Sequence, residues 1–113
     1  MRSMLSAVLL SAGLVAGAGV AADKPQATHA ATVKMTQEAF VPAQITVDAG
    51  TSITWINNDT VPHSVTAQDG KFDSGPIQPG KQFQWTAQAA GEINYHCIFH
   101  PSMTAVLTVR KAP

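Results

Sequence analysis

The stretch "GEINYHCIFHPSMTAVLTV", Gly91 to Val109, contains two runs in which apolar and polar side chains alternate. A period of two is typical of a half-buried β-strand, because successive side chains of a strand point to opposite faces. The pattern therefore predicts two strands joined by a tight loop, each with an apolar face towards the core. The predicted core-facing residues are Ile93, Tyr95, Cys97, Met103, Ala105, Leu107 and Val109.

The same alternation recurs upstream, in short runs rich in β-branched and aromatic side chains. The runs at 32–36, 43–50, 51–59, 63–67 and 81–87 are separated by turn residues, and 75–82 indicates two turns. No long run shows an apolar stripe with helical spacing. About seven or eight short strands in a chain of this length predict a small all-β domain, an antiparallel sandwich or barrel.

The first 22 residues differ in composition from the rest. After Arg2 they are rich in Leu, Ala, Val and Gly and carry no charge before Asp23. This pattern predicts a secretory signal peptide over residues 1–22, cleaved after Ala22. The alternative is an uncleaved anchor, since residues 4–22 are just long enough to span a bilayer. The richness in Gly and Ala and the lack of flanking charges favour cleavage.

Cleavage would leave a flexible leader over 23–31 and one folded domain over 32–113, located in the periplasm and without stable membrane insertion. The whole chain has 7 basic and 7 acidic side chains. This balance provides no electrostatic surface for nucleic acid or for an anionic membrane, so we expect neither as a partner.

The chain contains a single cysteine, Cys97. Export implies an oxidising compartment, where a lone exposed thiol would be oxidised or paired with another chain. One cysteine cannot form an internal disulfide. Cys97 is therefore buried, reactive or bound to a ligand.

The spacing Cys97-x2-His100-x2-Met103 favours the third of these options. Three-residue steps in a tight loop let a thiolate, an imidazole and a thioether converge on one point. One further imidazole would complete the two-His, one-Cys set with a weak methionine that is typical of blue-copper electron-transfer sites. Structural zinc sites fit less well, because they use Cys and His without a thioether.

The second imidazole is predicted to come from His63. His29 lies in the polar leader, where nothing would hold it in place. His96 adjoins Cys97 in a strand, so its side chain should point to the opposite face. His63 follows Pro62 at the start of a predicted strand, from which it can reach the end of the Cys97 strand.

Simpler interpretations of these residues exist. A free cysteine is often a small buried apolar group, a lone histidine is often structural, and Met103 could be ordinary core. Cys97 could also be a nucleophile with His96 or His100 as its base, but no glycine-rich oxyanion feature flanks it. The joint spacing in an exported all-β chain favours the metal site.

Two segments carry a resemblance that covers nearly all of residues 32–113. "FVPAQITVDAGTSITWINNDTVPHSV" and "FDSGPIQPGKQFQWTAQAAGEINYHCIFHPSMTAVLTV" resemble the two halves of the cupredoxins, and within them the amicyanin and plastocyanin branch. The short C-x2-H-x2-M loop is similar to that of amicyanin. The resemblance implies an eight-stranded Greek-key β-sandwich. It also implies one type 1 copper ion held by His63, Cys97, His100 and Met103.

The same resemblance implies a monomer that shuttles single electrons between larger redox partners, a donor and an acceptor. Three positions depart from the family pattern, with Ser64 in place of Asn, Phe99 in place of Pro and Ala105 in place of Gly. Unlike proline, Phe99 has a backbone N–H. We expect this N–H to point at the Cys97 sulfur and tune the site. The alternative is that Phe99 only adds apolar surface to a docking patch.

Two other functions compete with the electron carrier. A copper chaperone or buffer would bind Cu(I), stay colourless and pass its metal to an acceptor. An enzyme fits least well, because a copper ion with four protein ligands leaves no open position for a substrate. We therefore expect no enzymatic activity.

Overall fold

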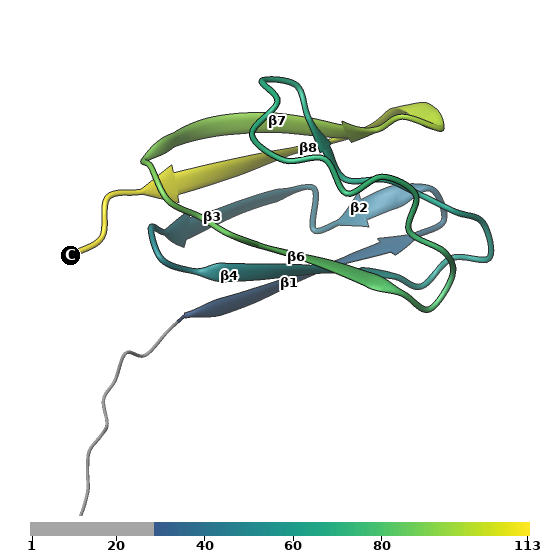
Figure 1. Ribbon diagram of the computed structural model, residues 1–113, viewed down its shortest axis with the longest axis horizontal. Helices are drawn as coiled ribbons and strands as arrows, with labels where there is room; N and C mark the ends of the chain where they lie inside the picture. Colours follow the sequence, from purple (N-terminus) through teal and green to yellow (C-terminus); the bar gives the residue numbers. More distant parts are fainter. Residues whose placement is uncertain (1–28) are drawn as a thin grey trace, which may run out of the picture.

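The computed structural model describes residues 29–113, which form eight β-strands and no helix. The strands face each other as two layers (Figure 1). No helix among these residues has the length and apolar character that a membrane crossing requires. The strands are β1 (Ala30–Thr36), β2 (Ala39–Val41), β3 (Gln44–Asp48), β4 (Ser52–Asn57), β5 (Thr66–Ala67), β6 (Gln82–Thr86), β7 (Gly91–Cys97) and β8 (His100–Arg110).

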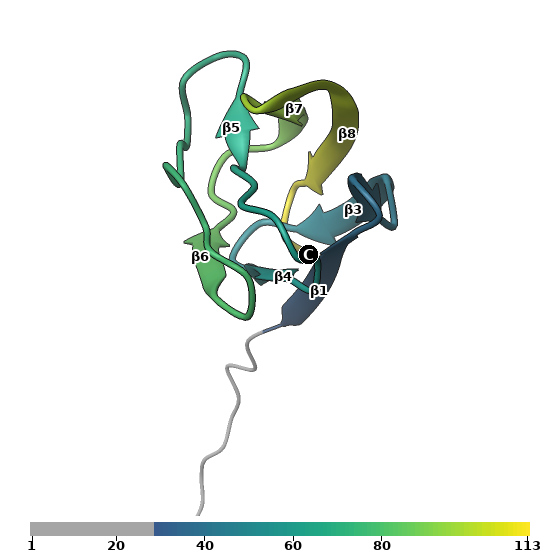
Figure 2. The same ribbon diagram turned by 90° about the vertical axis from the view of Figure 1, so that its right-hand side faces the viewer.

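The predicted β-sandwich is confirmed, but its sheets are not purely antiparallel. One sheet has the order β2-β1-β4-β6 and the other β3-β8-β7-β5. The view along the strands separates the two layers (Figure 2). β1 pairs with β4 in parallel, and so does β3 with β8. Alternation has the same period in parallel and antiparallel strands, so the sequence pattern could not distinguish them.

The side chains that the alternation predicted to face the core are buried in the structure. Ile93 pairs with Leu107 and Tyr95 with Ala105 across β7 and β8, and all four side chains are buried. The other predicted core positions of this stretch, Cys97, Met103 and Val109, are buried as well.

Aromatic side chains join the two sheets beneath the end of β7. Trp55 of β4 is fully buried, and its Nε1–H donates to the hydroxyl of Tyr95 on β7 at 3.2 Å. Phe72 packs against Trp55 with ring centroids 5.5 Å apart, and Phe40 packs against Tyr95 at 4.8 Å. Close packing of this kind gives β7 a rigid base.

Several element boundaries differ from the predictions. β2 was not predicted, because its three residues are too short to show a period. β1 begins at Ala30, so the last two residues of the predicted leader belong to the sheet. The predicted strand at 63–67 contributes only β5, because His63 forms an isolated bridge with Ile77 instead. The predicted signal peptide over 1–22 and the leader residues 23–28 lie outside the described residues.

Candidate metal centre

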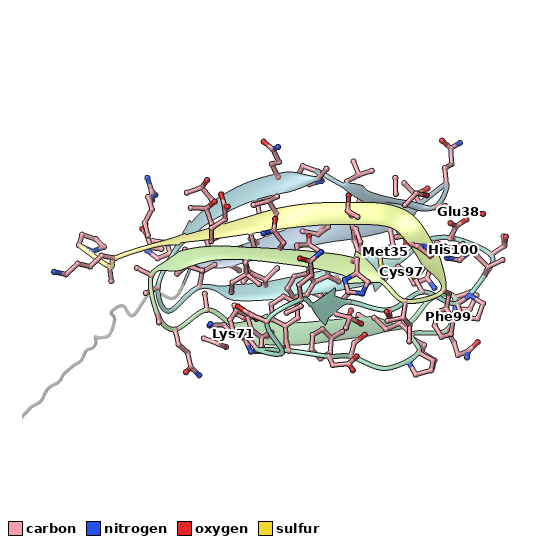
Figure 3. The ribbon with its side chains drawn as sticks, turned by 90° about the horizontal axis from the view of Figure 1, so that it is seen from above. Met35, Glu38, Lys71, Cys97, Phe99 and His100 are labelled. Carbon is pink, nitrogen blue, oxygen red and sulfur yellow. The ribbon has the colours of Figure 1, made fainter. Side chains whose placement is uncertain are left out.

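The spacing between Cys97 and His100 has a direct structural cause. Only Ile98 and Phe99 separate β7 from β8, so Cys97 and His100 are paired across the two strands. Residues directly opposite in an antiparallel pair point to the same face. The Sγ of Cys97 therefore lies 3.6 Å from Nδ1 of His100. Figure 3 shows both side chains at one end of the sandwich, with Phe99 beside them.

His63 reaches the same point from a distant part of the sequence. Its Nδ1 lies 3.7 Å from the Cys97 sulfur, and its ring is fully buried. Two backbone hydrogen bonds with Ile77, of 3.1 and 2.7 Å, hold the segment in place. The donor atoms of His63, Cys97 and His100 all lie within 4.8 Å of one another.

A carboxylate sets the orientation of the His63 ring. Nε2 of His63 lies 2.8 Å from Oδ2 of Asp59, and the backbone N–H of Glu38 donates to the same oxygen at 2.9 Å. An ionised carboxylate only accepts hydrogen bonds, so the ring proton is on Nε2. The lone pair of Nδ1 is then free and faces Cys97, as a metal ligand requires. The His63 and Glu38 N–H groups lower the pKa of Asp59 to about 2.

A buried amide fixes the loop that carries Asp59 and His63. Asn57 is fully buried, and its Nδ2 donates to the carbonyls of Val61 at 2.9 Å and Ile77 at 2.8 Å. Its Oδ1 accepts the backbone N–H of Asp59 at 2.8 Å. With all its hydrogen-bonding groups engaged, this side chain gives the loop one defined conformation.

The hydrogen bond to the cysteine sulfur differs from the expectation. The N–H group that donates to Sγ of Cys97 belongs to Ser64, at 3.3 Å. Among the described residues, Phe99 makes no such bond, and its side chain is 46% exposed. The expectation was wrong because Phe99 occupies the turn between two paired strands, whereas Ser64 lies beside the sulfur from another part of the fold.

The remaining candidates are placed as follows. Met103 is buried on β8, three residues beyond His100. His96 is half-buried, pairs with Thr66 and Thr104, and is not part of the three-donor group. His29 lines a separate cavity of about 220 Å³ with Asp48 and Arg110, away from the other histidines.

The donor set has a definite chemical preference. A buried thiol between two imidazole nitrogens, with a thioether nearby in the sequence, fits copper better than zinc or a hard cation. Cys97 is buried, and burial protects a thiol from oxidation. The packing of the two sheets and the loop that carries His63 places the three donors close enough to share one metal ion.

An apolar surface surrounds the exposed edge of this centre. Ile98 is 51% exposed and Phe99 46%, and both flank the half-buried His100. Pro101 follows and is exposed too. Exposed apolar side chains that cluster around a functional group are typical of interaction surfaces.

Sequence reasoning missed the roles of Asp59 and Asn57. The run "NNDTVPH" contained a weak signal, a carboxylate four residues before the predicted ligand. Its meaning depends on a loop conformation that has no periodic signature.

Comparison with known proteins was made on the sequence and on the fold. The family model described as a cupredoxin-like domain matches residues 5–109. Amicyanin-alpha of Methylorubrum extorquens is 30% identical over 110 residues, which cover 93% of this chain and 92% of that protein. The chloroplastic plastocyanin of Tetradesmus obliquus is 33% identical over 87 residues, covering 64% of this chain and 60% of that protein.

A solved amicyanin structure is also similar to this chain. The Cu(I) form of an amicyanin variant superposes with a TM-score of 0.68 and 26% sequence identity. The match covers 74% of this chain and 85% of the other.

Proposed function

The chain belongs to the cupredoxin-like family, and from this premise we propose that it is an exported mononuclear copper protein that carries single electrons between larger redox proteins. The observation that carries the proposal is the group of His63, Cys97 and His100, whose donor atoms lie within 4.8 Å of one another. Met103 is proposed as the fourth, weak ligand. Bound copper would supply one-electron exchange between Cu(I) and Cu(II).

The protein's own contribution is to keep the donors still. His63 is held by Asp59 and by the backbone of Ile77, and Cys97 and His100 by the β7–β8 ladder. A packed β-scaffold moves little when the charge at its centre changes. Preorganisation of this kind keeps the cost of rearrangement low in both oxidation states.

Electrons are proposed to enter and leave at His100. His63 is fully buried, whereas His100 is half-buried and lies next to the exposed apolar side chains of Ile98 and Phe99. A small apolar surface suits brief, weak encounters with a donor and an acceptor. A monomer leaves this surface free, and we propose that the chain acts as one and has no enzymatic activity.

Export is the remaining part of the proposal. The pattern over residues 1–22 supports a signal peptide cleaved after Ala22, so that residues 23–113 work in the periplasm. Intact-mass measurement of the protein from a periplasmic fraction tests this. A mass that still includes residues 1–22 would contradict cleavage.

The central experiment combines a spectrum with a test of copper retention. The protein is loaded with one equivalent of Cu(II), its visible absorption is recorded, and it is taken through repeated reduction and oxidation in the presence of a copper chelator. An electron carrier should show an intense thiolate-to-copper band that returns in each oxidised state, with the copper retained.

The outcome also separates the carrier from a copper chaperone or buffer. A chaperone would bind Cu(I), show no intense band and lose its copper to the chelator. Cys97→Ser is the matched control, since it removes the thiolate while leaving the strand pairing in place. A colourless wild-type protein would contradict the proposal.

A further inference from the structure

A chain of hydroxyl groups leads from the turn between β7 and β8 to the surface. The backbone N–H of Ile98 donates to Oγ of Ser64 at 2.9 Å. Oγ of Ser64 lies 2.9 Å from Oγ1 of Thr66, which donates to Oδ1 of Asp73 at 3.2 Å. Ser64 is fully buried, whereas Asp73 is exposed. The three side chains therefore link the turn, through a buried serine, to an outer carboxylate.

The direction of this chain is fixed by proton counting. A hydroxyl has one proton, and an ionised carboxylate has none. Thr66 donates its proton to Asp73, so it can only accept from Ser64. Ser64 must then donate to Thr66, which leaves its lone pairs for the N–H of Ile98. Asp73 is itself held by the backbone N–H of Gly75 at 3.1 Å.

Ser64 holds the ligand turn in two places. Its backbone N–H donates to Sγ of Cys97 at 3.3 Å. Its side-chain oxygen accepts the backbone N–H of Ile98, the residue that follows Cys97. Its own neighbour in the sequence is His63. One buried residue thus connects the segment of one donor, His63, to the turn that sets the spacing of the other two.

We propose that Ser64, oriented by Thr66 and Asp73, is a positioning residue that clamps the turn between Cys97 and His100. A serine hydroxyl has one proton, so its orientation depends on its hydrogen-bond partners, and Thr66 and Asp73 provide them. The exposed side chain of Asp73, as the acceptor at the end of this chain of hydrogen bonds, therefore controls how firmly the turn is held. The effect on copper rests on the proposed function, but the clamp itself does not.

The first measurement is amide hydrogen exchange at Ile98 in the metal-free protein, followed by NMR. Ser64→Ala removes the acceptor and should accelerate exchange at Ile98 by about tenfold, because the N–H no longer has to break this hydrogen bond before it exchanges. Thr66→Val keeps the shape of the side chain but removes the hydroxyl, and should accelerate exchange in the same direction.

Asp73 provides the matched pair of variants. Asp73→Asn removes the charge but keeps an oxygen acceptor for Thr66 and Gly75, so exchange at Ile98 should stay within about twofold of wild type. Asp73→Ala removes the acceptor and should accelerate exchange. Because Asp73 is exposed, both variants should fold even if Ser64→Ala does not.

The second measurement is loss of copper to a chelator, with the reduction potential as a parallel readout. Ser64→Ala and Asp73→Ala should lose copper about 10- to 100-fold faster, the range expected when an outer partner of a metal ligand is removed. Their potentials should shift, whereas Asp73→Asn should match wild type in both readouts.

Two results would overturn the proposal. The clamp is wrong if Ile98 exchanges at the wild-type rate in both Ser64→Ala and Asp73→Ala. Its role at the metal centre is wrong if exchange accelerates but copper loss and potential stay unchanged. If even the wild-type protein binds no copper, the proposed function fails, and the exchange rates still decide the clamp.

Discussion

Removing one hydroxyl below the metal centre should reveal how the two sheets are joined. Tyr95 lies two residues before Cys97, and its hydroxyl accepts a hydrogen bond from Nε1–H of Trp55 at 3.2 Å. Both side chains are almost completely buried. Tyr95→Phe leaves the indole N–H without an acceptor in a place that water does not reach. At neutral pH this should reduce the free energy of unfolding by about 1–3 kcal/mol.

The same variant should behave in the opposite way at alkaline pH. Burial raises the pKa of Tyr95 from 10.0 to about 12. The folded state therefore holds the phenol proton more tightly than the unfolded chain. The contribution of the Tyr95 phenol to stability is fully present below about pH 10, and it is lost as the pH rises towards 12. A pKa difference of about two units corresponds to a loss of roughly 3 kcal/mol in the free energy of unfolding. Tyr95→Phe has no such loss, so its stability should approach or exceed that of wild type at high pH.

The assay is urea unfolding of the metal-free protein, with a reductant present, followed by far-UV circular dichroism from about pH 7 to about pH 11.5. Trp55→Phe is the control, because it removes the indole donor but keeps the phenol and so keeps the alkaline loss. Lysine titration affects all three proteins equally. Parallel stability curves for wild type and Tyr95→Phe across the alkaline range would refute the reasoning.

Further predictions concern Cys97, Asp59 and Phe99. Cys97→Ser should abolish the intense visible band after Cu(II) loading and leave the β-sheet circular dichroism unchanged; a band that persists would exclude the thiolate as its source. Asp59→Ala should weaken copper binding by about 10- to 100-fold, because it releases the ring of His63. Chelator competition measures this affinity, and equal affinity in this variant and wild type would contradict the role of Asp59. The pKa of Asp59 is lowered to about 2, so the stability that it contributes is present above about pH 4 and is lost as the pH falls towards 2. Asp59→Ala and Asp59→Asn should both lack this acid-dependent loss in unfolding experiments, because neither side chain ionises. A loss equal to that of wild type in both variants would contradict the prediction. Phe99→Ser should slow electron exchange with a protein partner without changing the visible spectrum. Lys71→Ser, at a site remote from His100 (Figure 3), should leave the rate unchanged. Equal slowing in both variants would argue against the apolar docking surface.

The sequence by itself determined the parts of this protein that depend on local order. Alternation along residues 91–109 predicted which side chains of β7 and β8 are buried, because a strand turns successive residues to opposite faces. The spacing of Cys97 and His100 indicated a shared ligand site, because two intervening residues form a turn that pairs the two positions. Both features are encoded within a few consecutive residues.

The tertiary structure decided everything that joins distant parts of the chain. His63 and Cys97 are 34 residues apart in sequence, and only the packing of the fold brings Nδ1 to within 3.7 Å of Sγ. The parallel pairing of β1 with β4 has the same local pattern as an antiparallel pairing, so it depends on how the chain crosses between sheets. Asp59 and Ser64 acquired their roles in the same way. A hydrogen bond across a loop or between sheets leaves no period in the sequence, because its geometry exists only after the core has formed.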